Sequence, residues 1–105
     1  MATLPNQRRF PRYLCDRHVR VIVGQSLMLD GWATDISRGG VGAIVPERIL
    51  PGEKVTLEMA QAMGQGSLLL NAVVRRQEGA MHGLEFLNVS DVQQRIIRHM
   101  CSRPA

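Results

Sequence analysis

The sequence is poor in lysine and in aromatic residues. Lys54 is the only lysine among 13 basic residues, and aromatic residues make up 4% of the 105-residue chain. Arginine therefore carries nearly all of the positive charge, and its planar guanidinium favours bidentate and stacked contacts with phosphates and bases. The scarcity of aromatic side chains argues against a stacking platform for single-stranded nucleic acid.

Cysteine is also scarce, and long hydrophobic runs are absent. Cys15 and Cys101 stand near opposite ends of the sequence without a C-x-x-C motif or a Cys/His cluster, so neither a disulfide framework nor a zinc site is indicated. No run approaches the roughly 18 apolar residues of a membrane span, and the N-terminus lacks the apolar segment of a signal peptide. We therefore expect a cytoplasmic protein with no membrane span and no metal or cofactor.

Patterns typical of catalysis are lacking as well. Ser37 has no base near it in the sequence, and neither cysteine has a context that would activate it. Paired carboxylates and a phosphate-binding loop of the G-x-x-x-x-G-K type do not occur. The sequence predicts a protein that is not an enzyme.

The length and the charge limit the remaining possibilities. A chain of 105 residues with 45% hydrophobic content has the size of one small domain with one core. Its net charge is +4 and its pI is near 10.0, which favours an anionic partner over a cationic one. Composition alone does not identify the anion.

Hydrophobic periodicity predicts six short strands. Val19, Val21 and Val23 alternate with Arg20 in the manner of a half-buried strand, and comparable segments follow at close intervals. The predicted strands span residues 19–23, 27–36, 41–45, 54–59, 67–75 and 81–87. Closely spaced short strands favour a small antiparallel barrel, because closure removes exposed edges.

The C-terminal segment changes to a helical period. Val92, Ile96 and Met100 recur every four residues, and Ser90 with Gln93 forms a capping box. This pattern predicts an amphipathic helix at about residues 90–101, with an apolar face that covers a barrel opening.

The sequence thus divides into two parts. Residues 1–12 show no periodic pattern and are predicted to form a flexible N-terminal arm. Residues 13–105 are predicted to form a single domain of the mainly β class, a six-stranded antiparallel barrel with a C-terminal α-helix. Within it we interpret His82 as a strand residue rather than a ligand, and Trp32 as packing on the barrel.

Two short polar motifs bracket the first predicted strands. Residues 8–12 read R-x-x-x-R, and residues 35–40 read D-x-S-x-x-G. Each motif alone is weak, since the first is common in solvated basic tails and the second in Asx-type turns. Together, in this order around a strand-rich segment, they resemble the signature of the PilZ domain.

The resemblance extends from about Arg8 to Met100 and includes the order of strands and the C-terminal helix. PilZ domains are bacterial receptors for cyclic di-GMP, so the resemblance implies that this dinucleotide is the ligand. By position, the ligand-binding residues it implies are Arg8, Arg12, Asp35, Ser37 and Gly40, with auxiliary contacts from Arg9, Arg38 and Gly39.

The residue types suit this ligand. The guanidinium groups of Arg8 and Arg12 match the O6 and N7 acceptors of guanine bidentately and also pair with phosphate. The carboxylate of Asp35 accepts from the N1 and N2 donors of guanine, an arrangement that adenine does not offer. Ser37 would offer a hydroxyl to the ligand, and Gly40 would let the backbone approach it.

The leading hypothesis is a receptor whose arm becomes ordered when cyclic di-GMP binds. Occupancy would then be relayed to an unidentified partner protein that controls motility, biofilm formation or exopolysaccharide. Two alternatives are a PilZ-fold adaptor that binds no ligand and a small basic barrel for single-stranded nucleic acid, although we expect no nucleic-acid polymer as partner. The sequence leaves open the affinity, the number of dinucleotides bound, the oligomeric state and the partner.

Overall fold

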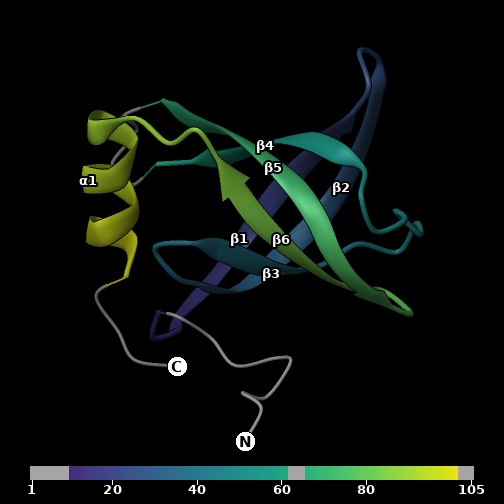
Figure 1. Ribbon diagram of the computed structural model, residues 1–105, viewed down its shortest axis with the longest axis horizontal. Helices are drawn as coiled ribbons and strands as arrows, with labels where there is room; N and C mark the ends of the chain where they lie inside the picture. Colours follow the sequence, from purple (N-terminus) through teal and green to yellow (C-terminus); the bar gives the residue numbers. More distant parts are fainter. Residues whose placement is uncertain (1–9, 62–65, 102–105) are drawn as a thin grey trace, which may run out of the picture.

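The computed structural model describes residues 10–61 and 66–101, which form six strands and one helix (Figure 1). In chain order these are β1 (Tyr13–Val23), β2 (Leu27–Ile36), β3 (Gly40–Ile44), β4 (Lys54–Ala60), β5 (Ser67–Glu78), β6 (Met81–Leu87) and α1 (Asp91–Met100). The strands close into a barrel in the order β1-β2-β3-β6-β5-β4, and every neighbouring pair is antiparallel. The predicted fold class is confirmed.

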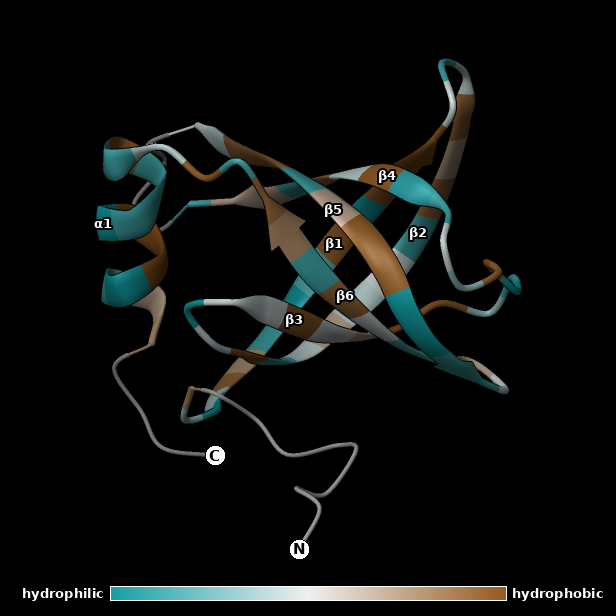
Figure 2. Ribbon diagram, viewed as in Figure 1, coloured by the Kyte–Doolittle hydropathy of each residue, from teal (hydrophilic) through white to brown (hydrophobic). Residues whose placement is uncertain are grey.

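Side chains alternate between the interior and the outer surface of the barrel. In β1, Val19 and Val21 are fully buried while Arg20 between them is exposed. Figure 2 shows the same alternation of hydrophobic and hydrophilic residues along other strands. Because each large apolar side chain taken out of water contributes about 1.5–3 kcal/mol, this inward set is the main source of stability.

The first strand is longer than predicted. β1 begins at Tyr13 and not at residue 19, and its register against β2 shifts between Leu14 and Arg17. Asp16, inside this irregularity, has a positive φ of 53°. Around this bulge an exposed Leu14 and a half-buried Arg17 depart from the pattern of apolar residues inside and polar residues outside, so the sequence showed only the regular half of the strand.

The fifth strand is longer than predicted for the same reason. β5 continues to Glu78 instead of ending at residue 75, and its register against β6 shifts between Val74 and Arg76. Beyond the bulge the ladder resumes, with Glu78 opposite Met81. The additional polar residues 76–78 of β5 form one side of the cleft described below.

Helix α1 covers one end of the barrel, as predicted (Figure 1). Ile97 is fully buried in the core, and Ile96 and Met100 pack against it. The prediction is wrong for Val92, which is 57% exposed. The first turn is attached by a polar contact instead, because the Gln93 side-chain amide donates to the Leu69 carbonyl oxygen at 2.7 Å.

His82 and Trp32 lie in different environments. His82 is buried in β6, where its Nε2 accepts from the Ile49 backbone N–H at 3.0 Å and its Nδ1 lies 2.9 Å from the Ala80 carbonyl oxygen. It lies in a strand, as predicted from the sequence. Trp32 is 43% exposed on the outer face of β2, and its indole N–H donates to Asp16 Oδ1 at 2.8 Å.

The capping box at the start of α1 yields a stability prediction. The Ser90 hydroxyl accepts from the Gln93 backbone N–H at 3.1 Å, and the Gln93 side chain accepts from the Ser90 N–H at 2.9 Å. Ser90→Ala is expected to lower the free energy of unfolding by about 1 kcal/mol, because it leaves a helical N–H without its acceptor. Denaturant unfolding measures this loss.

Ser90→Thr keeps a hydroxyl at the cap and is the control, expected to stay closer to the wild-type stability. An alanine variant as stable as the wild type would contradict the capping role.

Candidate functional site

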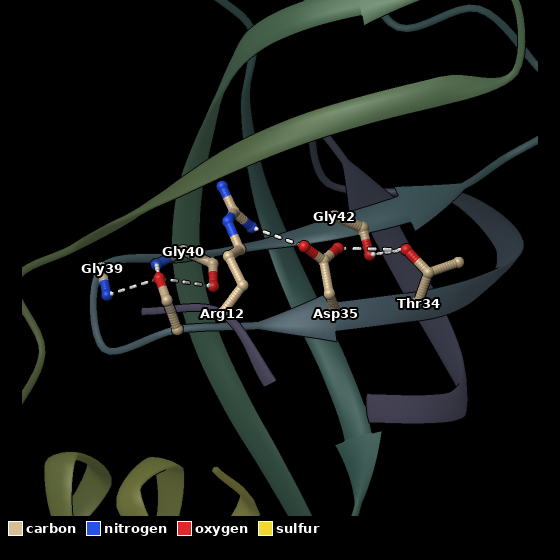
Figure 3. Close-up of polar contacts among 7 residues, drawn as sticks. Arg12, Thr34, Asp35, Gly39, Gly40 and Gly42 are labelled. Carbon is tan, nitrogen blue, oxygen red and sulfur yellow. Dashed lines mark hydrogen bonds and ion pairs between the residues drawn. The ribbon is translucent and has the colours of Figure 1, made fainter. Parts of the chain in front are cut away.

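The D-x-S-x-x-G motif forms the tight connection between β2 and β3. Ser37 is 5% exposed, and its hydroxyl oxygen accepts from the backbone N–H groups of Gly39 at 3.1 Å and Gly40 at 3.2 Å (Figure 3). The Ser37 backbone N–H in turn donates to the Gly40 carbonyl oxygen at 2.8 Å. The Ser37 hydroxyl, which was predicted to contact the ligand, therefore stabilises the turn by hydrogen bonds within it.

Gly40 is required by the packing of two strands. A Cβ at this position would collide with the Leu84 carbonyl oxygen of β6, so only glycine lets β3 approach β6 this closely. The adjacent Gly39 carbonyl accepts from the Phe86 N–H at 2.9 Å. The glycines of the motif thus fix the turn against the neighbouring strand.

Arg12 and Asp35 come from different motifs and meet on the outer face of the barrel. Arg12 Nη1 lies 3.3 Å from Asp35 Oδ2, and the two side chains are 21% and 25% exposed (Figure 3). Two residues that the sequence reasoning did not select support this aspartate. Thr34 Oγ1 lies 3.1 Å from Asp35 Oδ1 and 3.3 Å from the Gly42 carbonyl oxygen, within hydrogen-bond reach of both.

Gly42 makes room for the carboxylate. It stands opposite Asp35 in the β2–β3 ladder, and a Cβ on Gly42 would overlap Asp35 Oδ1. The register of β2 against β3 shifts between Ala33 and Asp35, so a bulge helps to turn the aspartate outward. Counting outward from a four-residue connection at 37–40 pairs Ile36 with Val41 and Asp35 with this glycine, a signal available in the sequence.

The auxiliary residues of the second motif contact the start of the described chain. The Arg38 guanidinium carbon lies 5.4 Å from the centroid of the Phe10 ring, a cation–π geometry. A Cβ on Gly39 would lie 2.9 Å from two carbons of the same ring. Phe10 was not predicted as a site residue. Its ring packs against the turn and so holds the segment that carries Arg12 beside it. Arg8 and Arg9 lie outside the described residues.

Next to the Arg12–Asp35 pair is an open cleft of about 550 Å³. It spans β2, β3, β6 and β5 and the loops beside them, and charged side chains of both signs border it. The lining residues are Arg12, Asp35, Gly42, Pro51, Arg76, Gln77, Glu78, Met81, His82 and Gly83. Neither Ser37 nor Gly40 lines the cleft, so the structure separates the five predicted residues into Arg12 and Asp35 at its edge, Ser37 and Gly40 in the turn, and Arg8, which is not described.

Neither of the two cysteines is activated as a nucleophile. Burial raises the pKa of the Cys15 thiol to about 11 and also raises the pKa of Cys101, so both thiols are protonated at neutral pH and are poor nucleophiles. Within residues 10–61 and 66–101, no three His, Cys, Asp or Glu side chains are grouped as metal ligands would be. The described helix is too short to cross a membrane.

The turn geometry predicts that Ser37 matters for stability even without a ligand. Ser37→Ala removes the acceptor of two backbone N–H groups in a buried turn, and it is expected to lower the free energy of unfolding by about 1–3 kcal/mol. Chemical denaturation of the ligand-free protein measures this change. Ser67→Ala, at an exposed serine of β5, is the control and should have little effect. Equal stabilities of the two variants would contradict the turn-holding role.

Comparison with known proteins agrees with this architecture. The sequence profile of the PilZ domain matches residues 6–103. The chain is similar to the PilZ domain of YcgR from Escherichia coli, solved with c-di-GMP, with a TM-score of 0.74 and 19% identity, covering 91% of this chain and 89% of that chain. It is also similar to the PilZ domain of CeSA from a cellulose-synthesizing bacterium, with a TM-score of 0.70 and 18% identity over 86% and 93% of the two chains.

A third similar structure is MotI/DgrA, the inhibitor of motility of Bacillus subtilis, with a TM-score of 0.71 and 18% identity, covering 90% of this chain and 50% of that chain. No curated protein matches the sequence significantly. The structural likenesses establish the fold, and the profile match over nearly the whole chain establishes the family. PilZ domains are binding domains and not enzymes. The chain belongs to the PilZ domain family, a family of receptors for cyclic di-GMP.

Proposed function

We propose that this protein is a cyclic di-GMP receptor that binds its ligand at the cleft beside Arg12 and Asp35. The observation that supports this function most directly is the Arg12–Asp35 contact at 3.3 Å. It brings an arginine of the R-x-x-x-R motif and the aspartate of the D-x-S-x-x-G motif to one edge of a cleft. Two motifs that are separated in sequence thereby act on one surface.

Asp35 retains the capacity to read guanine. A carboxylate has about four acceptor positions, and the contacts with Arg12 and Thr34 occupy only some of them. The remaining positions suit the N1 and N2 donors of a guanine base lying in the cleft. Because the side chain is 25% exposed, a ligand reaches it without a large rearrangement of the barrel.

Arg12 supplies the complementary group. Its guanidinium lies beside the carboxylate and lines the same cleft, where it would pair with a phosphate or with the O6 and N7 acceptors of a base. Arg8, which lies outside the described residues, would add a second guanidinium from the arm. Phe10, the first described residue, packs against the turn at Gly39.

The output of the receptor would be a change in its N-terminal arm. Arginines of the arm that gain phosphate or base contacts would become ordered over the barrel, and a partner protein would recognise the ordered form. Control of motility, biofilm formation or exopolysaccharide is the process we propose. The similarity to an inhibitor of motility and to the PilZ domain of CeSA from a cellulose-synthesizing bacterium supports this choice.

A second candidate function, an adaptor that uses the fold without the ligand, is favoured by the turn. Ser37 and Gly40 both have structural roles that need no ligand, since the hydroxyl holds two N–H groups and the glycine packs against β6. Their presence would therefore be expected in an adaptor too. Arg12 and Asp35 have no comparable role in the barrel core, so they distinguish the two functions.

Isothermal titration of the protein with cyclic di-GMP tests the receptor function. Arg12→Ala and Asp35→Ala are each expected to weaken binding by roughly 5- to 150-fold, equivalent to about 1–3 kcal/mol for one good polar contact. The fold should survive both changes, because a partly exposed ion pair contributes only about 0–1 kcal/mol to stability.

Arg20→Ala is the matched control. Arg20 also pairs with a carboxylate, Glu58 at 3.6 Å, but it does not line the cleft. Its loss should leave the affinity unchanged. Wild-type protein that gives no binding heat at millimolar ligand would favour the adaptor, and binding that is unaffected by either cleft variant would refute the assignment of the site.

A further inference from the structure

Four residues form a straight row across the outer face of the barrel at the cleft. Asp35 on β2 stands opposite Gly42 on β3, Gly42 stands opposite Gly83 on β6, and Gly83 stands opposite Arg76 on β5. All four line the cleft. A carboxylate and a guanidinium are thus separated by two consecutive residues without side chains.

The charged side chains at both ends of the row extend over Gly42 and Gly83, which together form a floor without side chains. Asp35 Oδ1 occupies the place that a Cβ of Gly42 would take. On the other side, the Cβ of Arg76 lies 3.7 Å and its Nε 4.0 Å from the position of a Cβ on Gly83. The two side chains therefore approach the same open floor from opposite edges.

β-bulges aim both side chains outward. In β5 the register shift between Val74 and Arg76 leaves Arg75 and Arg76 both exposed, although consecutive strand residues ordinarily face opposite sides. Arg75 is engaged by Glu85, with Nε 2.6 Å from Oε1. Among the described residues, Arg76 forms no ion pair, so its charge is available to the cleft.

We propose that Arg76 is a further ligand-binding residue, which contacts a phosphate of the nucleotide from the edge of the cleft opposite Asp35. This inference rests on the proposed function. Four neighbouring strands place the ends of the row about 14 Å apart at roughly 4.8 Å per strand. A dinucleotide is long enough to span that floor, with a guanine at Asp35 and a phosphate near Arg76, while the ligand passes over Gly83.

The neighbouring arginines of β5 provide a matched experiment. Titration with cyclic di-GMP is carried out on wild-type protein, Arg76→Ala, Arg76→Lys and Arg75→Ala. Arg76→Ala should weaken binding about tenfold, while Arg76→Lys should retain most of the affinity because a phosphate accepts a point charge. Arg75→Ala removes the same charge from the adjacent position outside the cleft and should bind as the wild type does.

Gly83→Ala tests the floor independently of charge. The space above Gly83 admits a methyl group at ordinary contact distance, so the melting temperature should not fall, yet the methyl group would stand in the path of the ligand. Affinity should therefore drop with the fold intact.

The outcomes separate the two proposals. Wild-type binding that Arg76→Ala weakens no more than Arg75→Ala would overturn the role of Arg76 and leave the receptor function standing. Equal weakening by Arg76→Ala and Arg76→Lys would also overturn the phosphate contact. A wild-type protein that does not bind the dinucleotide would overturn both.

Discussion

The antiparallel register of β2, β3, β6 and β5 is the constraint on which the site depends. It aligns Asp35, Gly42, Gly83 and Arg76 across four strands, although these residues come from distant parts of the sequence. Barrel closure makes this register stable, because a slip by one residue would turn every buried side chain of a strand to the outside. The same ladder that forms the core therefore fixes the distances between the charges of the cleft.

The turn between β2 and β3 depends on two residues of the second motif. Ser37 uses its hydroxyl on two backbone N–H groups, and Gly40 permits the close approach of β3 to β6. Both residues act on Asp35 indirectly, since they determine where β2 ends and how the hairpin continues. The serine and the final glycine of this motif therefore have structural roles that need no ligand.

Two bulges shape the polar surface at the cleft. The shifts in β2 and β5 leave two consecutive residues unburied where a regular strand would alternate, and both shifts lie at the edges of the cleft. They turn Asp35 and Arg76 outward at a small local cost in ladder hydrogen bonds. In β2 the interior is not disturbed, because Ala33 and Ile36 on either side of the shift are both buried.

The sequence by itself determined the barrel, the C-terminal helix with its Ser90 cap, and the two motifs, because these features depend on local periodicity and on contacts between near neighbours. It did not reveal the first half of β1 or the end of β5, since bulges hide strands from a period-two pattern. Only the tertiary structure decided that Ser37 faces the turn and that Thr34 and Gly42 support Asp35. Only the tertiary structure placed Arg76 across the cleft from Asp35. Strand order and register are set by the packing of the whole core, and no local pattern in β5 encodes which residues of the other strands will lie beside it.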